Sequence, residues 1–319
     1  MSQSPTLTVE RPSRPAKPKR HTSPTKRKQY LAAYLFLLPF FVVFLTMLVV
    51  PLVYSGYLSL FESKLIGGEV FAGLANYARA LSDPQFLASL GRVGLFFVIQ
   101  VPIMLGLALF LALALDTARA RGSKAIRLLV FMPYAVPAVV ATLMWGYLYG
   151  ADFGPIAQIA RSVGLGTPDF LSPQNILGSM MNIVTWEFVG YNMIIMYAAL
   201  RSIPSELYEA AEIDGAGQFR LAWSVKIPAI RPAILLTVIF SVIGSFQLFA
   251  EPSLLNAIAP DAITNAFTPN YYGYNIAFIN QELNYAAAVA FLLGLVIAIV
   301  SYIVQLGEQR RDRRERGMS

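Results

Sequence analysis

The chain has 319 residues, of which 56% are hydrophobic and 13% are charged, and its formal net charge is +7. A soluble fold of this length leaves much of its surface in water and could not hide so much apolar side chain. There is no cysteine, and the single histidine is His21, so disulfides, cysteine or histidine metal centres and histidine-based catalysis are excluded. The composition therefore predicts a multi-pass membrane protein.

Six apolar stretches reach the length of about 20 residues that a helix needs to cross ~30 Å of hydrocarbon. Each is apolar around its whole circumference, which favours a helix over a barrel strand, where apolar and polar residues alternate. The first is too long for a signal peptide, so we expect it to be retained, and Pro133 and Pro137 should kink the third. The spans are expected at about residues 31–60, 93–115, 128–149, 176–200, 230–250 and 285–306.

Lysine and arginine are distributed unevenly around these spans. They number 8 in residues 1–29, 4 in 116–127, 4 in 201–231 and 5 in 308–319, together 21 of the 25 in the chain. If successive spans alternate in direction, all 21 fall on one side, and the positive-inside rule places that side in the cytoplasm. The sequence therefore predicts an all-α integral membrane protein with six transmembrane helices and with both termini in the cytoplasm.

Both ends of the chain are basic, and the first is also rich in proline. Residues 1–29 are expected to be a disordered basic cytoplasmic tail, residues 30–306 a six-helix membrane domain, and residues 307–319 a basic cytoplasmic tail. The charge flanks the spans and is not interleaved with stacking aromatics, so it does not indicate nucleic acid as a partner. No internal repeat relates the first three spans to the last three, which weakens an interpretation as an inverted-repeat carrier.

The cytoplasmic segment 202–228, between the fourth and fifth spans, predicts two short helices joined by a turn. Pro204 suits the start of the first helix, and Gly215 suits its end because glycine adopts the left-handed conformation at little cost. The second helix is expected over residues 218–226, stopped by Pro228. The result would be a helix–turn–helix lying on the cytoplasmic face.

This segment resembles the EAA loop of ABC importer permeases. Glu209-Ala210-Ala211, Gly215 and Val225-Lys226-Ile227-Pro228 reproduce the spacing E-A-A-x3-G-x9-I-x-L-P, with valine in place of isoleucine and isoleucine in place of leucine. In that family the loop docks on an ATPase subunit and transmits its closure to the membrane helices. The resemblance implies an ATPase-coupling site made of Glu209, Ala210, Ala211, Asp214, Gly215, Ala216 and Pro228.

Other runs are similar to sugar permeases of the maltose and glycerol-3-phosphate type, namely Leu35-Phe-Leu-Leu-Pro39, Phe71-Ala-Gly-Leu-Ala-Asn-Tyr77 and Ser245-Phe-Gln-Leu-Phe-Ala-Glu-Pro252. The resemblance implies the type I ABC importer permease fold and a multi-pass location in a bacterial or archaeal cell membrane. It further implies a permease subunit of an ATP-driven, binding-protein-dependent sugar importer. Its partners would be a second homologous permease in a heterodimer, a cytoplasmic ABC ATPase dimer, an extracytoplasmic solute-binding protein and a sugar.

The chain contains no G-x-x-x-x-G-K-[ST] phosphate loop, so ATP and Mg²⁺ are expected to be used by the partner ATPase. We expect no catalytic residue, cofactor or metal in this chain. Two alternatives remain for the transport function: an importer permease for a non-sugar solute such as glycerol-3-phosphate, and an ion-coupled secondary carrier. A membrane-embedded enzyme finds no support, because the sequence offers no cluster of catalytic acids, histidines or metal ligands.

Polar residues within the fourth and fifth spans are candidates for a substrate pathway. An ionisable group inside the hydrocarbon costs about 2.5–3.5 kcal/mol and therefore needs a reason. Carboxylates, amides, hydroxyls and an aromatic ring suit the hydroxyls of a sugar, and by resemblance sugar permeases use positions on these two helices. Helix-to-helix hydrogen bonding is the alternative role. The candidates are Glu187, Tyr191, Asn192, Ser241, Ser245, Gln247 and Glu251.

Overall fold

The computed structural model describes residues 24–64, 66–117 and 123–316, and its contacts divide the chain into two units, residues 1–54 and 55–319. In the first unit, helix α1 (Pro24–Phe44) runs through a π-helical turn, η1 (Leu45–Val49), into the start of α2 (Val50–Ser59). Residues 24–29, which were expected to be disordered, are helical and form the first part of α1. The rest of that expected tail lies outside the described residues.

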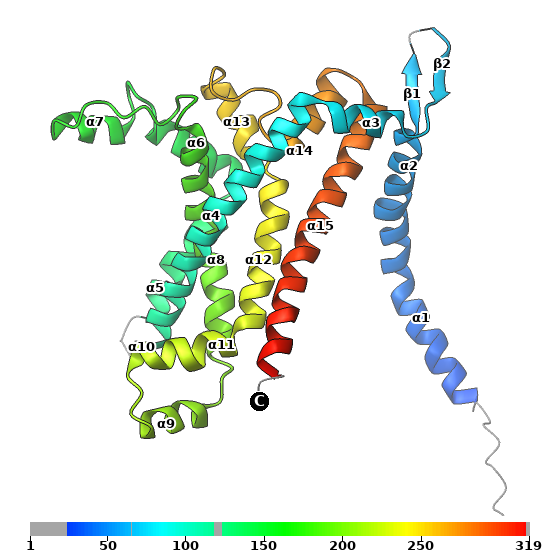
Figure 1. The fold of residues 1–319 in the computed structure, drawn as a ribbon. Helices are drawn as coiled ribbons and strands as arrows, with labels where there is room; N and C mark the ends of the chain where they lie inside the picture. The colour runs from blue at the N-terminus through cyan, green and yellow to red at the C-terminus, as the bar shows by residue number, and fades with distance from the viewer. Residues whose placement is uncertain (1–23, 65, 118–122, 317–319) are drawn as a thin grey trace, which may run out of the picture. The chain divides into compact units, whose positions relative to one another are not determined.

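The second unit is helical apart from one two-stranded hairpin (Figure 1). Its elements after α2 are β1 (Phe61–Lys64), β2 (Gly68–Phe71), α3 (Ala75–Ser82), α4 (Pro84–Thr117), α5 (Ser123–Phe131), the 3-10 turn η2 (Met132–Ala135), α6 (Ala138–Leu148), α7 (Pro155–Ser162), α8 (Ile176–Leu200), α9 (Ser205–Ile213), α10 (Gln218–Leu221), the π-helical turn η3 (Ala222–Lys226), α11 (Ile227–Ala229), α12 (Arg231–Phe246), α13 (Ala250–Ile258), α14 (Pro269–Tyr274), the π-helical turn η4 (Asn275–Ile279) and α15 (Leu283–Arg316).

Within the described residues, four helices are long and apolar enough to cross a membrane: Lys28–Ser59, Pro84–Asp116, Ile176–Leu200 and Leu283–Glu308. Two further pairs of helices reach that length only together, because each pair is sharply bent. They are Ser123–Ala135 with α6 and Gln218–Ala229 with α12, so the chain has four to six candidate spans. The protein is therefore a multi-pass helical membrane protein.

The third expected span is two helices and not one kinked helix. The segment Ser123–Ala135 meets α6 at an angle of 94°. Proline disfavours helical backbone in the residue before it, and Val136, which precedes Pro137, is extended with φ −77° and ψ 127°. The end of α5 lies against α8 at Gly190, where an added Cβ would overlap the Val130 carbonyl and come within 2.9 Å of the Phe131 Cα. Glycine therefore permits the close approach of the two backbones.

The prediction that Pro228 stops the second helix of the loop is wrong. The helix that begins at Gln218 continues through η3 and α11 to Ala229 and then turns by 67° into α12. Pro228 lies in the first turn of α11, where the missing N–H of a proline costs little. The fifth expected span also ends early, because α12 stops at Phe246 and Glu251 belongs to a separate helix, α13.

Helices α4 and α8 form the centre of the second unit. Small side chains on α4, Ala108 and Ala112, are fully buried in one cluster with Met193 and Met196 of α8. Because alanine lets helix backbones approach and methionine fills irregular gaps, this pairing is close along the length of both helices. Both helices line the cavity described below, and α8 leads directly into the loop.

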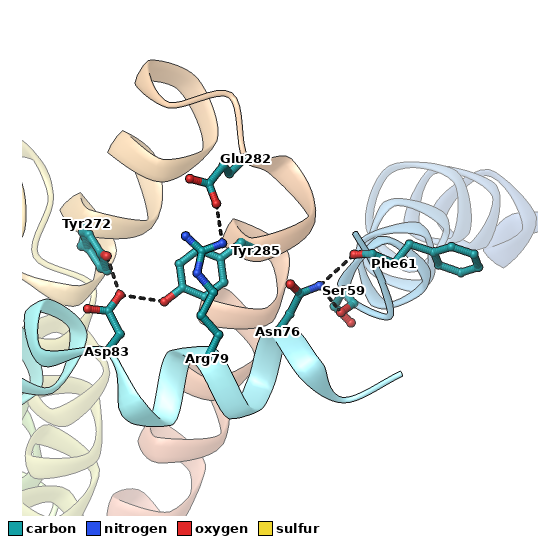
Figure 2. A network of polar contacts seen from close by, with 8 residues as sticks. All are labelled: Ser59, Phe61, Asn76, Arg79, Asp83, Tyr272, Glu282 and Tyr285. Carbon is teal, nitrogen blue, oxygen red and sulfur yellow. Dashed lines mark hydrogen bonds and ion pairs between the residues drawn. The ribbon is translucent and has the colours of Figure 1, made fainter. Parts of the chain in front are cut away.

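The hairpin was not predicted. Its two strands are antiparallel, with Phe61 opposite Phe71, and Gly67 and Gly68 supply the positive φ values of the turn. The amide of Asn76 on α3 donates to the Ser59 and Phe61 carbonyls at 3.0 and 2.8 Å, which holds the hairpin at the end of α3 (Figure 2).

A polar network ties α3 to α14 and α15 at the end of the unit opposite the loop 202–228 (Figures 1 and 2). Asp83 accepts hydrogen bonds from the hydroxyls of Tyr272, at 2.5 Å, and Tyr285, at 2.7 Å. Arg79 lies 3.8 Å above the Tyr285 ring and pairs with Glu282 at 2.5 Å. The network therefore joins α3 to two helices that follow it by about 190 residues in the sequence.

Candidate functional site

A cavity of about 510 Å³ lies among α4, α8, α12 and α13. Its size falls within the range of small-molecule sites, which are mostly apolar with a few convergent polar groups. Six of the seven predicted substrate-pathway residues line it, although they come from three different helices: Tyr191, Asn192, Ser241, Ser245, Gln247 and Glu251. The sequence shows only which span each of these residues belongs to, and the fold brings them together around one cavity.

Aromatic rings form one side of the cavity. Tyr134 of η2 and Tyr191 of α8 are stacked, with ring centres 4.7 Å apart and an interplanar angle of 20°. Phe188, one turn before Tyr191, meets Tyr134 edge to face at 5.7 Å. Tyr134 lies in the 3-10 turn η2, two residues before the break at Val136, so the irregular third span supplies part of the site.

Two amides on the cavity wall are held by neighbouring groups. Gln100 of α4 donates to the hydroxyl of Thr185 at 3.2 Å, and Asn192 donates to the Phe188 carbonyl at 3.0 Å. Both amides keep further donor or acceptor capacity for a solute. Gln100 and Tyr134 were missed by the sequence reasoning, although Gln100, as a polar residue inside an apolar span, carried a signal.

Glu187 does not line the cavity. Its side chain is buried in α8, one turn before Tyr191, and its Oε2 atom has no hydrogen-bond partner among the described residues. A substrate role for Glu187 stays a prediction.

The loop 202–228 folds as two helices around a glycine turn. After α9 ends, Gly215 adopts φ +74°, and the N–H of Ala216 donates to the Ala211 carbonyl at 2.9 Å. This bond, closing over a left-handed residue, is the Schellman end of a helix. No atom lies within 4 Å of an added Cβ at Gly215, so the backbone conformation and not crowding favours glycine there. The predicted left-handed turn at Gly215 is confirmed.

The same loop exposes large apolar side chains. Ile213, Phe219 and Trp223 are 87%, 84% and 69% exposed, and Leu207 is half exposed. The predicted coupling residues Glu209, Ala210, Asp214 and Gly215 are exposed beside them, whereas Ala211, Ala216 and Pro228 are half-buried. Exposed apolar side chains gathered on a short loop are typical of a surface that contacts another protein.

Comparisons with known proteins agree with this class of multi-pass helical membrane protein. Residues 104–313 match the family model described as "Binding-protein-dependent transport system inner membrane component". The chain is 31% identical to the lactose transport system permease protein LacF of Rhizobium radiobacter, over 88% of this chain and 96% of the relative. It is 32% identical to the sn-glycerol-3-phosphate transport system permease protein UgpA of Agrobacterium fabrum, over 75% and 82%.

The fold also has a solved counterpart. One chain of a bacterial alginate ABC transporter, in complex with an alginate pentasaccharide-bound periplasmic protein, superposes with a TM-score of 0.80 over 90% of this chain and 96% of that chain, at 20% identity. The chain therefore belongs to the family of inner membrane components of binding-protein-dependent transport systems.

Proposed function

We propose that the chain is the membrane-spanning permease subunit of an ATP-driven, binding-protein-dependent sugar importer, and that it forms half of the translocation pathway. The observation that carries this proposal is the cavity at Tyr191 and Glu251, which combines stacked aromatic rings with amides, hydroxyls and a carboxylate. Sugars present hydroxyls that donate and accept, together with apolar ring faces, and this lining offers partners for both. The resemblance to a lactose permease supports the same solute class.

The charge of the cavity favours a sugar over glycerol-3-phosphate, the solute named for the second relative. Glu251 is the charged side chain among the described lining residues, and no lysine or arginine is among them. A phosphate monoester in such a site would be repelled by the carboxylate and would find no cation to replace its hydration. An uncharged sugar avoids both penalties.

The proposed topology has six spans with both termini in the cytoplasm, each bent pair of helices counting as one span. It rests on the four to six candidate spans and on the gathering of 21 of 25 basic residues on one side. The loop 202–228 would then face the cytoplasm. Thiol labelling of cysteines introduced at Ser63 and Ser319 in intact cells tests this arrangement, with labelling expected only at Ser63.

The loop would couple this chain to ATP hydrolysis in a partner. Its exposed apolar side chains and the glycine turn suit docking into a cleft on a cytoplasmic ATPase, which would use ATP and Mg²⁺. Closure of the ATPase dimer would move the loop, rock the helices and open the cavity outward. A second homologous permease completes the proposed assembly, together with an extracytoplasmic solute-binding protein comparable to the periplasmic protein bound to the solved alginate transporter.

Co-purification tests the assembly. Tagged chain extracted in mild detergent is expected to retain an ABC ATPase and a second permease, because its loop surface is apolar and needs a partner. An ion-coupled secondary carrier is the competing function, and it would purify without an ATPase. Replacing Phe219 and Trp223 together by serine should release the ATPase while leaving the second permease bound.

A further inference from the structure

A buried ion pair joins the loop to helix α4. The Lys226 Nζ atom lies 2.7 Å from Asp116 Oδ2, and the two side chains are only 4% and 6% exposed. Asp116 lies at the end of α4 and Lys226 at the end of η3, so the pair links positions 110 residues apart. Because a charge is costly to bury, a carboxylate and an ammonium in this position stabilise each other only if they stay together.

The position of Asp116 makes the pairing necessary. The C-terminal end of a helix carries partial negative charge, so an aspartate in the last turn of α4 is unfavourable there. Among the described residues, two cations offset it: Lys226 in direct contact, and Arg201 at the end of α8 with its Nη1 atom 4.0 Å from Asp116 Oδ1. The Arg201 side chain is 66% exposed, so water screens its contribution, whereas the Lys226 contact is shielded.

The first helix of the loop meets the same junction. The ring of Tyr208 on α9 lies 5.4 Å from Lys226 Nζ, within the range of a cation–π contact. Its hydroxyl donates to the Leu200 carbonyl at 3.4 Å, and burial, followed by the charge of Asp116, raises the pKa of Tyr208 and keeps this donor protonated. Both helices of the loop and the ends of α4 and α8 therefore converge on one buried pair.

We propose that Asp116 and Lys226 are positioning residues that form the joint through which the loop moves α4 and α8 together. This inference rests on the proposed function and names the contact that transmits its ATP-driven movement. Lys226 ends a π-helical turn, a local irregularity often found at functional sites, and only the short helix α11 separates it from the 67° turn into α12. A pull on the loop at Lys226 would thus act on α4 through the ion pair, on α8 through its packing against α4, and on α12 through the chain.

The test uses the whole transport complex and one reporter cysteine. Because the chain has no cysteine of its own, Ser241→Cys on the cavity wall would be its single thiol. The probe is a membrane-impermeant maleimide added from outside, with and without ATP plus orthovanadate to trap the closed ATPase. Labelling of this chain, separated on a gel, reports outward opening of the cavity without requiring the identity of the sugar.

When the pair is intact, outward labelling should rise about tenfold on trapping. In Lys226→Gln it should rise less than about twofold, because removing one partner of a buried ion pair shifts an equilibrium by more than about tenfold. The double variant D116N/K226Q removes both buried charges and keeps a hydrogen-bonding pair, so it should recover at least about half of the response. Arg201→Gln removes an exposed cation near the same carboxylate and is the matched control, with the response of the intact pair expected.

The amount of ATPase that co-purifies with each variant separates folding from coupling. A lost labelling response in Lys226→Gln with ATPase still bound supports the joint. An unchanged response in Lys226→Gln, or a double variant that is no better than the single one, would overturn the inference while the proposed function stands. A complex with the pair intact that shows no response to ATP and vanadate would overturn the proposed function, and the joint with it.

Discussion

Tyr134 of η2 and Tyr191 of α8 stack with their ring centres 4.7 Å apart, and together they form the aromatic side of the cavity. The two residues are 57 positions apart in the sequence, and Tyr134 lies two residues before the extended backbone at Val136. The irregular third span therefore contributes directly to the site.

Removing this stack should weaken sugar transport. An aromatic pair contributes about 0.5–1.5 kcal/mol beyond its buried area, so Tyr191→Ala should lower uptake by about threefold to tenfold with unchanged amounts of assembled complex. Tyr191→Phe keeps the ring and should retain most of the activity. If Tyr191→Ala transports as fast as Tyr191→Phe in proteoliposomes, the stack serves only to pack α8.

The carboxylate of Glu251 should matter as a hydrogen-bond acceptor. A hydrogen bond to a charged group contributes about 1.5–3 kcal/mol, so Glu251→Leu should lower sugar uptake by at least about tenfold, whereas Glu251→Gln should cost less because it still accepts. Ser253→Ala, on the same helix but outside the cavity lining, is the control. Equal activity of the leucine and glutamine variants in an uptake assay would remove Glu251 from the pathway.

Gly215→Asp should uncouple the loop. Aspartate at φ +74° carries strain of about 1 kcal/mol or more, and its charge lies beside Asp214 on the exposed turn. We expect binding-protein-stimulated ATP hydrolysis to fall about fivefold to tenfold while the helices still insert.

Gly217→Asp provides the matched control for this variant, because it adds the same charge two residues away at an ordinary φ of −68°. Its activity should stay close to that of the unaltered complex. Should the two variants lose the same activity, charge and not backbone conformation is responsible, and the importance of the glycine turn is refuted.

Asp83 should give the protein a pH-dependent stability. Burial alone would raise the pKa of Asp83, but hydrogen bonds from Tyr272, Tyr285 and the backbone of Gln85 and Phe86 hold it below its usual value of 3.8. A carboxyl with a lowered pKa stabilises the fold above the pKa of the unfolded chain, and this stabilisation is lost as the pH falls through the folded value.

Asp83→Asn should therefore lower the melting temperature at pH 7 by about 2 °C, a small shift because the site is partly exposed to water. The difference from the unaltered protein should shrink as the pH falls below 3.8. Thermal denaturation in detergent at pH 7 and pH 3 measures it, with Tyr147→Phe, an exposed tyrosine, as the control. A difference that grows toward acid pH would contradict the assignment.

Local signals in the sequence predict local structure well. The fourth span is α8 over Ile176–Leu200, as predicted, because a long apolar run bounded by polar residues leaves little choice of where the helix begins and ends. The turn at Gly215 follows from the same kind of signal, since glycine is the residue that ends a helix in the left-handed conformation.

The parts that the sequence does not reveal depend on contacts over long distances. Tyr134 joins Tyr191 on the cavity wall, and Asp116 pairs with Lys226, through packing of α4, α5 and α8 that no local pattern encodes. Glu187 is not among the residues that line the cavity, although it lies one turn from Tyr191, because burial depends on what packs against α8. Helix spacing fixes which residues are neighbours and not which side meets solvent.

The central claim is that this chain forms a sugar pathway driven by ATP in a partner. The most direct measurement is uptake of a labelled uncharged sugar, chosen as the one its solute-binding protein retains on purification, into proteoliposomes holding the complex and ATP. We predict uptake that requires enclosed ATP and the binding protein, persists when ionophores dissipate all ion gradients, and is not inhibited by glycerol-3-phosphate. Uptake that needs an ion gradient and proceeds without ATP would contradict the account.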